Sequence, residues 1–482
     1  MTKTINFLKI HSDLILVFIL GFVLRIKDIL RDDFWYDEAF TGLLIQAPPQ
    51  EFHQILIGDV HPPFYMYVAK VWSSLFGVTD FSLRFLSLIF GMIIIYVIYK
   101  LVLVLFVKKE VAVIAAFLTA VNPFNVGYSY EGRSYTLYGL IALLTFYALY
   151  TKKYNFFVLG LCIMIYTHYM SSVFILLFVI YYLIKSVPET THKKLFTFKP
   201  IGKNVLRLIP FIIFYIYIYN NGITTSIRNQ NIEWADRSAF YNIPDTFTSY
   251  SYGVKVKQPG KSQANHIDFF LDENKLGRVI LILYLVSGSL VLILSLKNKN
   301  RIEPFLVSSL LFLLPQLLLI IYGMQTNKNV YVERYIFPSS LFFIISVSYI
   351  ITYKIKFEIT ALIILFYIFT VSKIQPVNTY YKGMKNLYNN FKDYNGELIF
   401  TSPADYTIAR YYFNDYEKVK LMDPKNPNER YLWWWFVYES SAPKETAGAL
   451  LITPDDSRMT EEYVKVDTGK ETGTYKIYKK NN

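Results

Sequence analysis

The chain has one cysteine, Cys162, in 482 residues, and only 18% of its residues are charged. A single cysteine excludes an intrachain disulfide and a thiolate metal site. The sequence also has no glycine-rich phosphate loop, no zinc-type His/Cys spacing and no calcium-loop pattern. We therefore expect no nucleotide site and no required cofactor. Any activated phosphate would be carried on a lipid.

The chain is rich in apolar residues: 54% of it is hydrophobic and 18% is aromatic. Bilayer-length runs cover 13–30, 84–106, 111–128, 134–151, 205–221, 277–296, 304–323, 335–353 and 357–374. The stretch 156–184 is too long for one span, and the polar break Tyr166-Thr167-His168-Tyr169 divides it. We predict an α-helical polytopic membrane protein with about eleven transmembrane helices. Arg25, at the end of the first span, is expected to snorkel toward the headgroups.

The formal charge of +13 comes from basic residues in short loops between the spans. This is the positive-inside pattern rather than a nucleic-acid surface. It predicts a cytoplasmic amino terminus, and it excludes a nucleic-acid partner. The polar groups that then fall on the outer side are Asp37-Glu38, His61, Glu131/Arg133, His168 and Glu333-Arg334. We expect a site at the outer face.

Composition divides the chain into residues 1–375, a transmembrane catalytic domain, and 376–482, a small extracytoplasmic α/β domain. The first outer loop, 31–83, carries the acidic motif and an aromatic amphipathic helix over 64–78. The polar loop 222–276 is expected to be a mobile lid or an acceptor-binding element. The expected elements of the last domain are strands at 397–402, 449–453 and 474–478 and a helix at 404–413.

Asp37 and Glu38 are adjacent acids that follow the first span. On a helix they point about 100° apart, so only one of them faces a given reacting atom. An ionised carboxylate there can act as a general base on an acceptor hydroxyl or amine. The alternative is that both acids are solvated or cap the following helix.

Arg133 lies where an outer loop enters a span, two residues from Glu131 and two from Tyr135. Arginine at membrane depth costs about 2.5–3.5 kcal/mol, so it is normally paired or lines a polar cavity. Its guanidinium suits a phosphate, and a structural pair with Glu131 is the alternative. Arg334 beside Glu333 repeats this arrangement and has the same two interpretations.

His61 precedes two prolines, which favour a rigid segment that presents the imidazole to a phosphate or a sugar hydroxyl. His168 ends a helix, where a structural histidine is the more common case. Arg84 is expected to be an interfacial anchor of the second span. The run Trp433-Trp434-Trp435 fits either headgroup contact or sugar stacking.

Taken in order, these pieces resemble a known family. They are Arg25, Phe34-Trp35-Tyr36-Asp37-Glu38-Ala39, His61-Pro62-Pro63-Phe64-Tyr65, Leu83–Ser87, Asn122-Pro123-Phe124, Tyr128–Tyr135, Tyr166–Tyr169 and Glu333-Arg334-Tyr335. The pattern is similar to that of the prokaryotic family 39-type glycosyltransferases of the GT-C superfamily. That group includes protein O-mannosyltransferases and the aminoarabinose transferase of lipid A.

The resemblance implies a polyprenyl-phosphate-linked sugar donor, inversion at the anomeric carbon, and a site facing away from the cytoplasm. The acceptor would be a lipid, protein or glycan. The acidic pair Asp37 and Glu38 becomes the candidate catalytic pair, with Asp37 activating the acceptor. The candidate donor-phosphate or substrate-binding residues are Arg133, Glu131, Tyr135, His61, Arg334 and His168.

The chain departs from the family pattern at two positions. Gly132 stands where the family usually has alanine. His61 stands where the aminoarabinose transferase has lysine. Some relatives use a divalent cation, but no ligand set can be assembled from these residues.

Two other functions fit parts of the pattern. A lipid-linked sugar flippase or transporter would carry charges deep in its spans, whereas the charges here gather at one face. A surface polysaccharide polymerase or ligase would use a lipid-diphosphate donor and is chemically close. A receptor or adhesin is disfavoured, because the outer tail is about a quarter of the chain.

Overall fold

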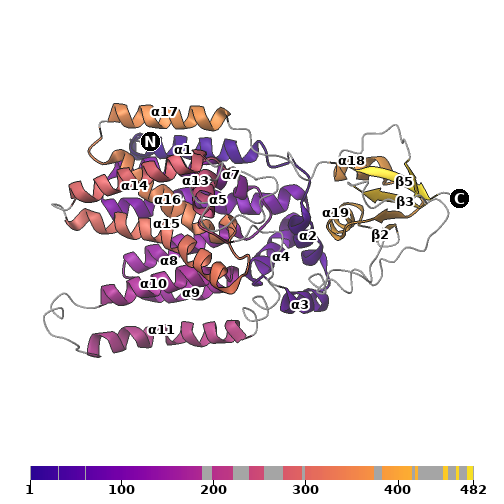
Figure 1. Cartoon of the computed structure of the whole chain (residues 1–482), viewed down its shortest axis with the longest axis horizontal. Coiled ribbons are helices and arrows are strands. Elements are labelled where there is room, and N and C mark those ends of the chain that lie inside the picture. Colours follow the sequence, from indigo (N-terminus) through magenta and orange to yellow (C-terminus); the bar gives the residue numbers. More distant parts are fainter. Residues whose placement is uncertain are drawn as a thin grey trace.

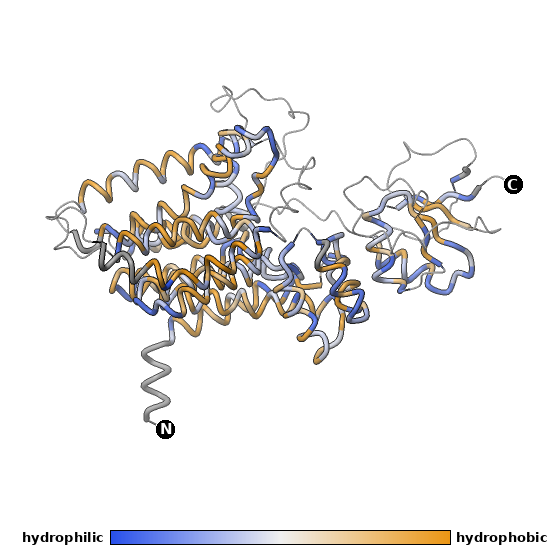
Figure 2. The backbone as a smooth tube through the Cα atoms, turned by 90° about the horizontal axis from the view of Figure 1, so that it is seen from below, coloured by the Kyte–Doolittle hydropathy of each residue, from blue (hydrophilic) through white to orange (hydrophobic). Residues whose placement is uncertain are grey.

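The computed structural model describes residues 2–30, 32–59, 61–186, 198–220, 238–253, 275–295, 299–355, 357–373, 383–414, 418–421, 449–453, 463–465 and 475–480. A bundle of apolar helices forms most of the molecule, and a small sheet lies beyond one end of it (Figure 1). Hydrophobic residues cover the bundle, whereas hydrophilic residues gather at its end and on the sheet unit (Figure 2). The chain is therefore a helical membrane protein with a small α/β unit.

Each predicted span coincides with a helix or a helix pair. These are α1 (Thr2–Ile26), α5 (Asp80–Phe106), α6 (Lys109–Val121) with α7 (Pro123–Ser129), α8 (Tyr135–Tyr150), α9 (Tyr154–Thr167), α10 (Ser171–Ser186), α11 (Phe198–Ile218), α14 (Lys275–Ser295), α15 (Lys299–Thr326), α16 (Phe337–Thr352) and α17 (Phe357–Lys373). Within the described ranges, four helices, or five counting one bent pair, are long and apolar enough to cross a membrane. The remaining apolar helices there are shorter.

The bent pair is α6 and α7, which meet at 60°. Pro123 opens α7, and the side chain of Asn122 accepts a hydrogen bond from the Asn125 N–H at 3.0 Å. The break leaves carbonyls of the last turn of α6 without helical partners. Arg25 donates to two of them, Ala120 O at 2.9 Å and Thr119 O at 3.1 Å. The prediction that Arg25 snorkels is wrong, because its guanidinium is fully buried at this helix end.

Three helices of the first outer loop lie at one end of the bundle (Figure 1). They are α2 (Tyr36–Gln46), α3 (Pro49–Gly58) and α4 (Phe64–Phe76). The predicted amphipathic helix is α4. It buries Tyr65 and Met66 and leaves Val71 and Leu75 exposed, as expected for a helix lying in an interface.

The predicted lid at 222–276 lies mostly outside the described residues. Its described part contains α13 (Asn242–Tyr252), and that part is not a mobile loop. The helix is buried along most of its length, and Asn122 Nδ2 donates to Tyr250 O at 2.6 Å. The Tyr250 ring also lies 4.9 Å from that of Phe124. Over these residues the expectation of a mobile lid is wrong, because α13 is a buried helix, whereas the acceptor-binding alternative stays a prediction.

The described part of the C-terminal tail, hereafter the C-terminal unit, begins at residue 383 and comprises α18 (Met384–Phe391), α19 (Pro403–Phe413) and five strands. The strands are β1 (Leu398–Phe400), β2 (Val419–Leu421), β3 (Leu450–Thr453), β4 (Tyr463–Lys465) and β5 (Lys476–Lys480), in the order β2-β1-β3-β5-β4. Strand β1 is parallel to β2 and β3, while β5 is antiparallel to β3 and β4. Strands β1, β3 and β5 and helix α19 overlap the predicted segments. The Trp433-Trp434-Trp435 run lies outside the described residues.

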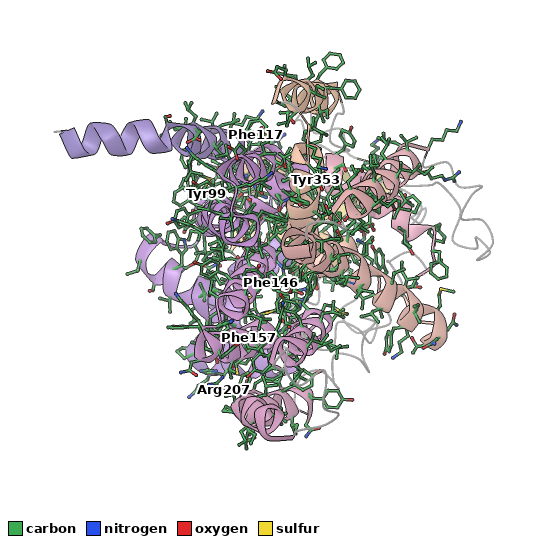
Figure 3. All side chains as sticks on the ribbon, turned by 90° about the vertical axis from the view of Figure 1, so that its left-hand side faces the viewer. Tyr99, Phe117, Phe146, Phe157, Arg207 and Tyr353 are labelled. Atoms are coloured by element: carbon green, nitrogen blue, oxygen red, sulfur yellow. The ribbon has the colours of Figure 1, made fainter. Side chains whose placement is uncertain are left out.

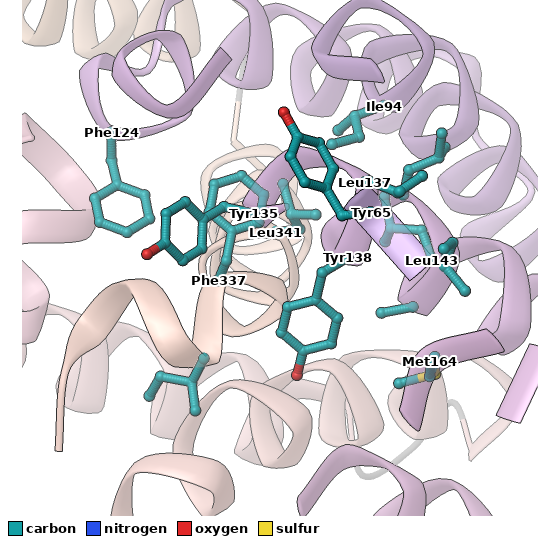
Figure 4. Close-up of a cluster of buried hydrophobic side chains, with 14 of the residues drawn as sticks. Tyr65, Ile94, Phe124, Tyr135, Leu137, Tyr138, Leu143, Met164, Phe337 and Leu341 are labelled. Carbon is teal, nitrogen blue, oxygen red and sulfur yellow. The ribbon is translucent and has the colours of Figure 1, made fainter. Parts of the chain in front are cut away.

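Aromatic side chains fill the core between the helices (Figure 3). Phe146 contacts the rings of Phe178 and Phe342 at 5.5 and 5.4 Å. A second group joins the start of α8 to α7 and α16, with Tyr135 beside Phe337 (Figure 4). Phe337 lies 5.8 Å from both Phe124 and Tyr128. This packing fixes the end of the bundle on which the polar residues lie.

Candidate active site

The two adjacent acids lie in the first turn of α2 and face different surroundings. Trp35 is the residue before the helix, and its N–H reaches Glu38 Oε2 at 3.4 Å. Glu38 is 1% exposed, whereas the side chain of Asp37 is 22% exposed. Acids in a first helical turn are favoured by the helix dipole. Because consecutive residues point about 100° apart, only Asp37 opens toward the site.

Glu38 forms a buried bidentate ion pair with Arg84 on α5. Arg84 Nε lies 2.9 Å from Oε1 and Nη2 lies 2.7 Å from Oε2. The Gly132 N–H also donates to Oε1 at 2.8 Å. Arg84 further donates to the carbonyls of Ile29, Asp32 and Asp33. The pair thus joins α2, α5 and the 130–134 loop, and its satisfied hydrogen bonds compensate for burying two charges.

Asp37 faces Arg133 at the other side of α2. The Arg133 Nη2 atom lies 3.8 Å from Asp37 Oδ2 and 3.4 Å from His61 Nε2. Its Nη1 atom donates to Asp37 O at 3.2 Å and to Thr41 Oγ1 at 3.1 Å. Arg133 is 3% exposed, so its charge acts in a site of low dielectric. A carboxylate and a guanidinium therefore lie side by side, the former partly open.

His61 is held between an acid and a cation. Its Nδ1 atom lies 3.3 Å from Asp59 Oδ1, and its Nε2 atom is the one that faces Arg133. A neutral imidazole with the proton on Nδ1 satisfies both contacts, because it donates to Asp59 and accepts from Arg133. His61 thus supports the guanidinium of Arg133.

Glu131 and Arg334 lie next to this group. Burial raises the pKa of Glu131 to about 8; nearby Arg334 lowers it, and the charges of Glu38 and Asp37 raise it. Its Oε2 atom is buried without a hydrogen-bond partner among the described residues. The Arg334 guanidinium lies 5.2 Å from the ring centre of Trp35 and 5.8 Å from that of Tyr335. The site therefore contains an acid that is largely protonated at neutral pH.

His168 follows α9 and stacks on Tyr138, with ring centres 5.0 Å apart. Its Nδ1 atom accepts the Met170 N–H at 3.2 Å, which leaves the proton of a neutral ring on Nε2. Burial first, and then the electrostatic effect of the nearby His61, Arg133 and Arg334, lowers the pKa of His168 to about 3. His168 is therefore a neutral donor at physiological pH.

The structure brings the predicted residues to one end of the bundle, although in two groups. Arg133 contacts both Asp37 and His61, whereas Glu38 belongs to the Arg84 pair. Tyr135 is buried in the first turn of α8, its ring edge-on to Tyr128 and 6.3 Å from His168. The structural alternative for Arg133, a pair with Glu131, is replaced by its contact with Asp37.

Sequence reasoning missed the role of Arg84. The prediction of an interfacial anchor is wrong, because Arg84 is 4% exposed and paired. A signal was present, because an arginine inside an apolar helix requires a partner, and Glu38 is one of several acids in the preceding loop. The sequence also gave no sign of Thr41 or Asp59. Among the described residues, no group of three or more His, Cys, Asp or Glu side chains could hold a metal ion.

The chain is similar to several solved structures, three of which are described here, and part of it matches one family model. The oligosaccharyltransferase of Archaeoglobus fulgidus in its apo form is 12% identical, covering 92% of this chain and 69% of its own, with a TM-score of 0.49. AglB from the same organism, in complex with an inhibitory peptide and a dolichol-phosphate, is 10% identical, covering 92% of this chain and 69% of its own, with a TM-score of 0.45. ArnT from Cupriavidus metallidurans, bound to undecaprenyl phosphate, is 11% identical, covering 97% of each chain, also at 0.45.

No curated protein matches the chain significantly. Residues 60–217, about a third of the chain, match the family model of the dolichyl-phosphate-mannose-protein mannosyltransferases. The matched segment contains His61, Arg84, Glu131, Arg133 and His168. Through this segment the chain is similar to the dolichyl-phosphate-mannose-protein mannosyltransferases, and the resemblance that its motifs predict is confirmed.

Proposed function

We propose that the chain is an inverting glycosyltransferase that moves a sugar from a polyprenyl-phosphate donor to a lipid, protein or glycan acceptor. The observation that carries this proposal is the division of the acidic pair. Glu38 is neutralised by Arg84, while Asp37 is partly open and lies 3.8 Å from Arg133. A base beside a phosphate-binding cation is what the transfer requires. The family match of residues 60–217 supports the reaction class.

In the proposed reaction, the proton of the acceptor hydroxyl or amine passes to Asp37 as its oxygen or nitrogen bonds to the anomeric carbon. The bond from that carbon to the phosphate oxygen breaks, and its electron pair stays on the departing polyprenyl phosphate. Arg133 and Arg334 stabilise the charge that collects there. By analogy with a preorganised oxyanion donor, removal of one such cation costs about 2.7–4 kcal/mol. If the acceptor is itself a phosphate, no base is needed and Asp37 orients it.

The neighbouring residues have supporting roles in this proposal. His61 holds the guanidinium of Arg133 through Nε2 rather than binding phosphate as a second cation. His168 carries its proton on Nε2 and Glu131 is protonated at neutral pH, so both can donate hydrogen bonds to sugar or phosphate oxygens. Tyr135 forms part of the aromatic wall beside His168.

We propose that this site faces the outside of a prokaryotic plasma membrane and that the amino terminus is cytoplasmic. Two basic ion pairs support this orientation. Lys109, at the start of α6, lies 2.9 Å from Asp13 of α1, and Lys185, near the end of α10, lies 2.5 Å from Glu303 of α15. Both lysines adjoin short loops that the sequence assigns to the inner side. Lysine-bearing short loops belong in the cytoplasm.

The test is mass spectrometry of polyprenyl lipids and surface glycans. Cells lacking the protein are compared with cells carrying the wild type, Asp37→Asn, or Glu110→Gln as a matched control, since Glu110 is an exposed acid at the start of α6. We expect one sugar-charged lipid to accumulate, and its sugar to disappear from a surface molecule, in the deletion and in Asp37→Asn only. Full restoration by Asp37→Asn would exclude it as the base. Unchanged glycans in the deletion would turn attention to lipid transport.

A further inference from the structure

Helix α19 of the C-terminal unit packs directly on the segment that carries Asp37. The Tyr412 hydroxyl accepts the Phe34 N–H at 2.9 Å and donates to Asp80 Oδ2 at 2.7 Å. The Tyr411 ring lies 4.9 Å from the Phe34 ring. Phe34 is fully buried, so without Tyr412 its N–H would lose this partner away from water.

A second contact with α19 is made by Gly42 of α2, which lies between one and two turns after the start of that helix. A Cβ atom added to Gly42 would lie 2.5 Å from Cε2 of Tyr411. Real Cβ atoms are essentially never found so close, and the Tyr411 ring is fixed by its contact with Phe34. Glycine is therefore required at position 42 for α2 and α19 to approach as they do.

Charged groups close the same interface. Asp33 Oδ2 accepts the N–H groups of Gly383 at 3.0 Å and Lys385 at 3.2 Å. The Lys385 ammonium lies 2.7 Å from Asp80 Oδ2 and 3.8 Å from Asp33 Oδ1. Asp33 precedes α2 and Asp80 opens α5, so the C-terminal unit joins the two elements that the Glu38–Arg84 pair also joins.

Asp37 is three residues from Phe34 and five from Gly42, and α2 is only eleven residues long. The contacts at Phe34 and at Gly42 are made by Tyr411 and Tyr412 of α19. A small shift of α2 would change the distance from Asp37 Oδ2 to Arg133, and also the Asp37 O and Thr41 contacts of that guanidinium. Catalytic groups lose much of their effect when displaced by about 1 Å.

We propose that the C-terminal unit positions the site, with Tyr411 and Tyr412 of α19 holding α2 so that Asp37 faces Arg133. These tyrosines are positioning residues, because they act through α2 and not on the substrate. The mechanical part of this inference stands on the contacts alone. Its consequence for the reaction rests on the proposed glycosyl transfer.

The test uses the full-length protein in detergent or nanodiscs with Tyr412→Phe and Gly42→Ala. The first control is Tyr388→Phe, because Tyr388 belongs to the same unit but its hydroxyl has no hydrogen bond to the described residues of the first loop. The second control is Gly127→Ala, because no atom lies within 4 Å of a Cβ added at Gly127. Hydrogen exchange measured by mass spectrometry reports on residues 33–46. Loss of one buried hydrogen bond predicts about tenfold faster exchange near Phe34 in Tyr412→Phe, and neither control changes it.

Transfer kinetics provide the second measurement. Both test variants should lower kcat for the sugar donor identified by lipid analysis more than they raise its KM. Merely reducing the amount of folded protein would lower the apparent kcat and leave the exchange of the folded fraction unchanged. Unchanged exchange in both test variants, or faster exchange with normal kcat, would overturn the inference. If the wild type transfers no sugar, the proposed function fails, and exchange alone decides whether α19 holds α2.

Discussion

Replacing Glu38 with glutamine tests the assignment of this acid to structure rather than to chemistry. The substitution keeps the shape but removes the charge, and it turns an amide N–H₂ group toward Arg84, which has only donors. Arg84 would then be a buried cation that retains three carbonyl acceptors but loses the carboxylate in direct contact with it. Breaking a buried ion pair from one side costs about 3–5 kcal/mol. That is a large part of the stability of an ordinary domain.

The assay is a double-mutant cycle on purified protein, with unfolding followed by denaturant. Glu38→Gln and Arg84→Met should each destabilise strongly, whereas the double variant should be less destabilised than their sum by about 2 kcal/mol or more. Glu303→Gln is the control. Its partner Lys185 is half-exposed, so its loss should cost less than about 1 kcal/mol. Additive effects, or a Glu38→Gln protein as stable as wild type, would refute the structural role and reopen a catalytic one.

Three further predictions concern the same end of the bundle. Gly132→Ala should retain wild-type glycan profiles and stability, because an added Cβ meets Leu83 and Glu38 only at 3.4 and 3.5 Å, within ordinary contact; a profile like that of the deletion would contradict this. The raised pKa of Glu131, about 8 against 4.5, means that the folded state binds more protons between these values, so stability should fall as pH rises from about 4.5 to 8; Glu131→Gln should flatten this part of a melting-temperature profile. The lowered pKa of His168, about 3 against 6.5, has the opposite sign, because the unfolded state then binds more protons. Stability should therefore be lost as pH falls from about 6.5 toward 3, and His168→Gln should remove that loss. If the melting temperature of His168→Gln falls with acid as much as that of the wild type, other groups cause the loss of stability.

The sequence by itself determined the helices and their order. Apolar runs of bilayer length predict the bounds of α14, α16 and α17 to within two residues, because a chain in hydrocarbon must satisfy its own backbone hydrogen bonds. The break at Tyr166–Tyr169 and the start of α19 were equally local, since polar residues and Pro403 interrupt or begin helices through their own chemistry. The grouping of polar loops at one end followed from alternation of spans and charge.

Only the tertiary structure decided what each polar residue does. Asp37 and Glu38 are adjacent acids, yet Asp37 contacts Arg133 of the 130–134 loop and Glu38 contacts Arg84 of α5, and both arginines lie about fifty residues or more further along the chain. Arg25 snorkels in an isolated span but here binds the broken end of α6. These outcomes depend on distances between elements distant in sequence. A buried charge is stable only beside its partner, and packing brings that partner into place.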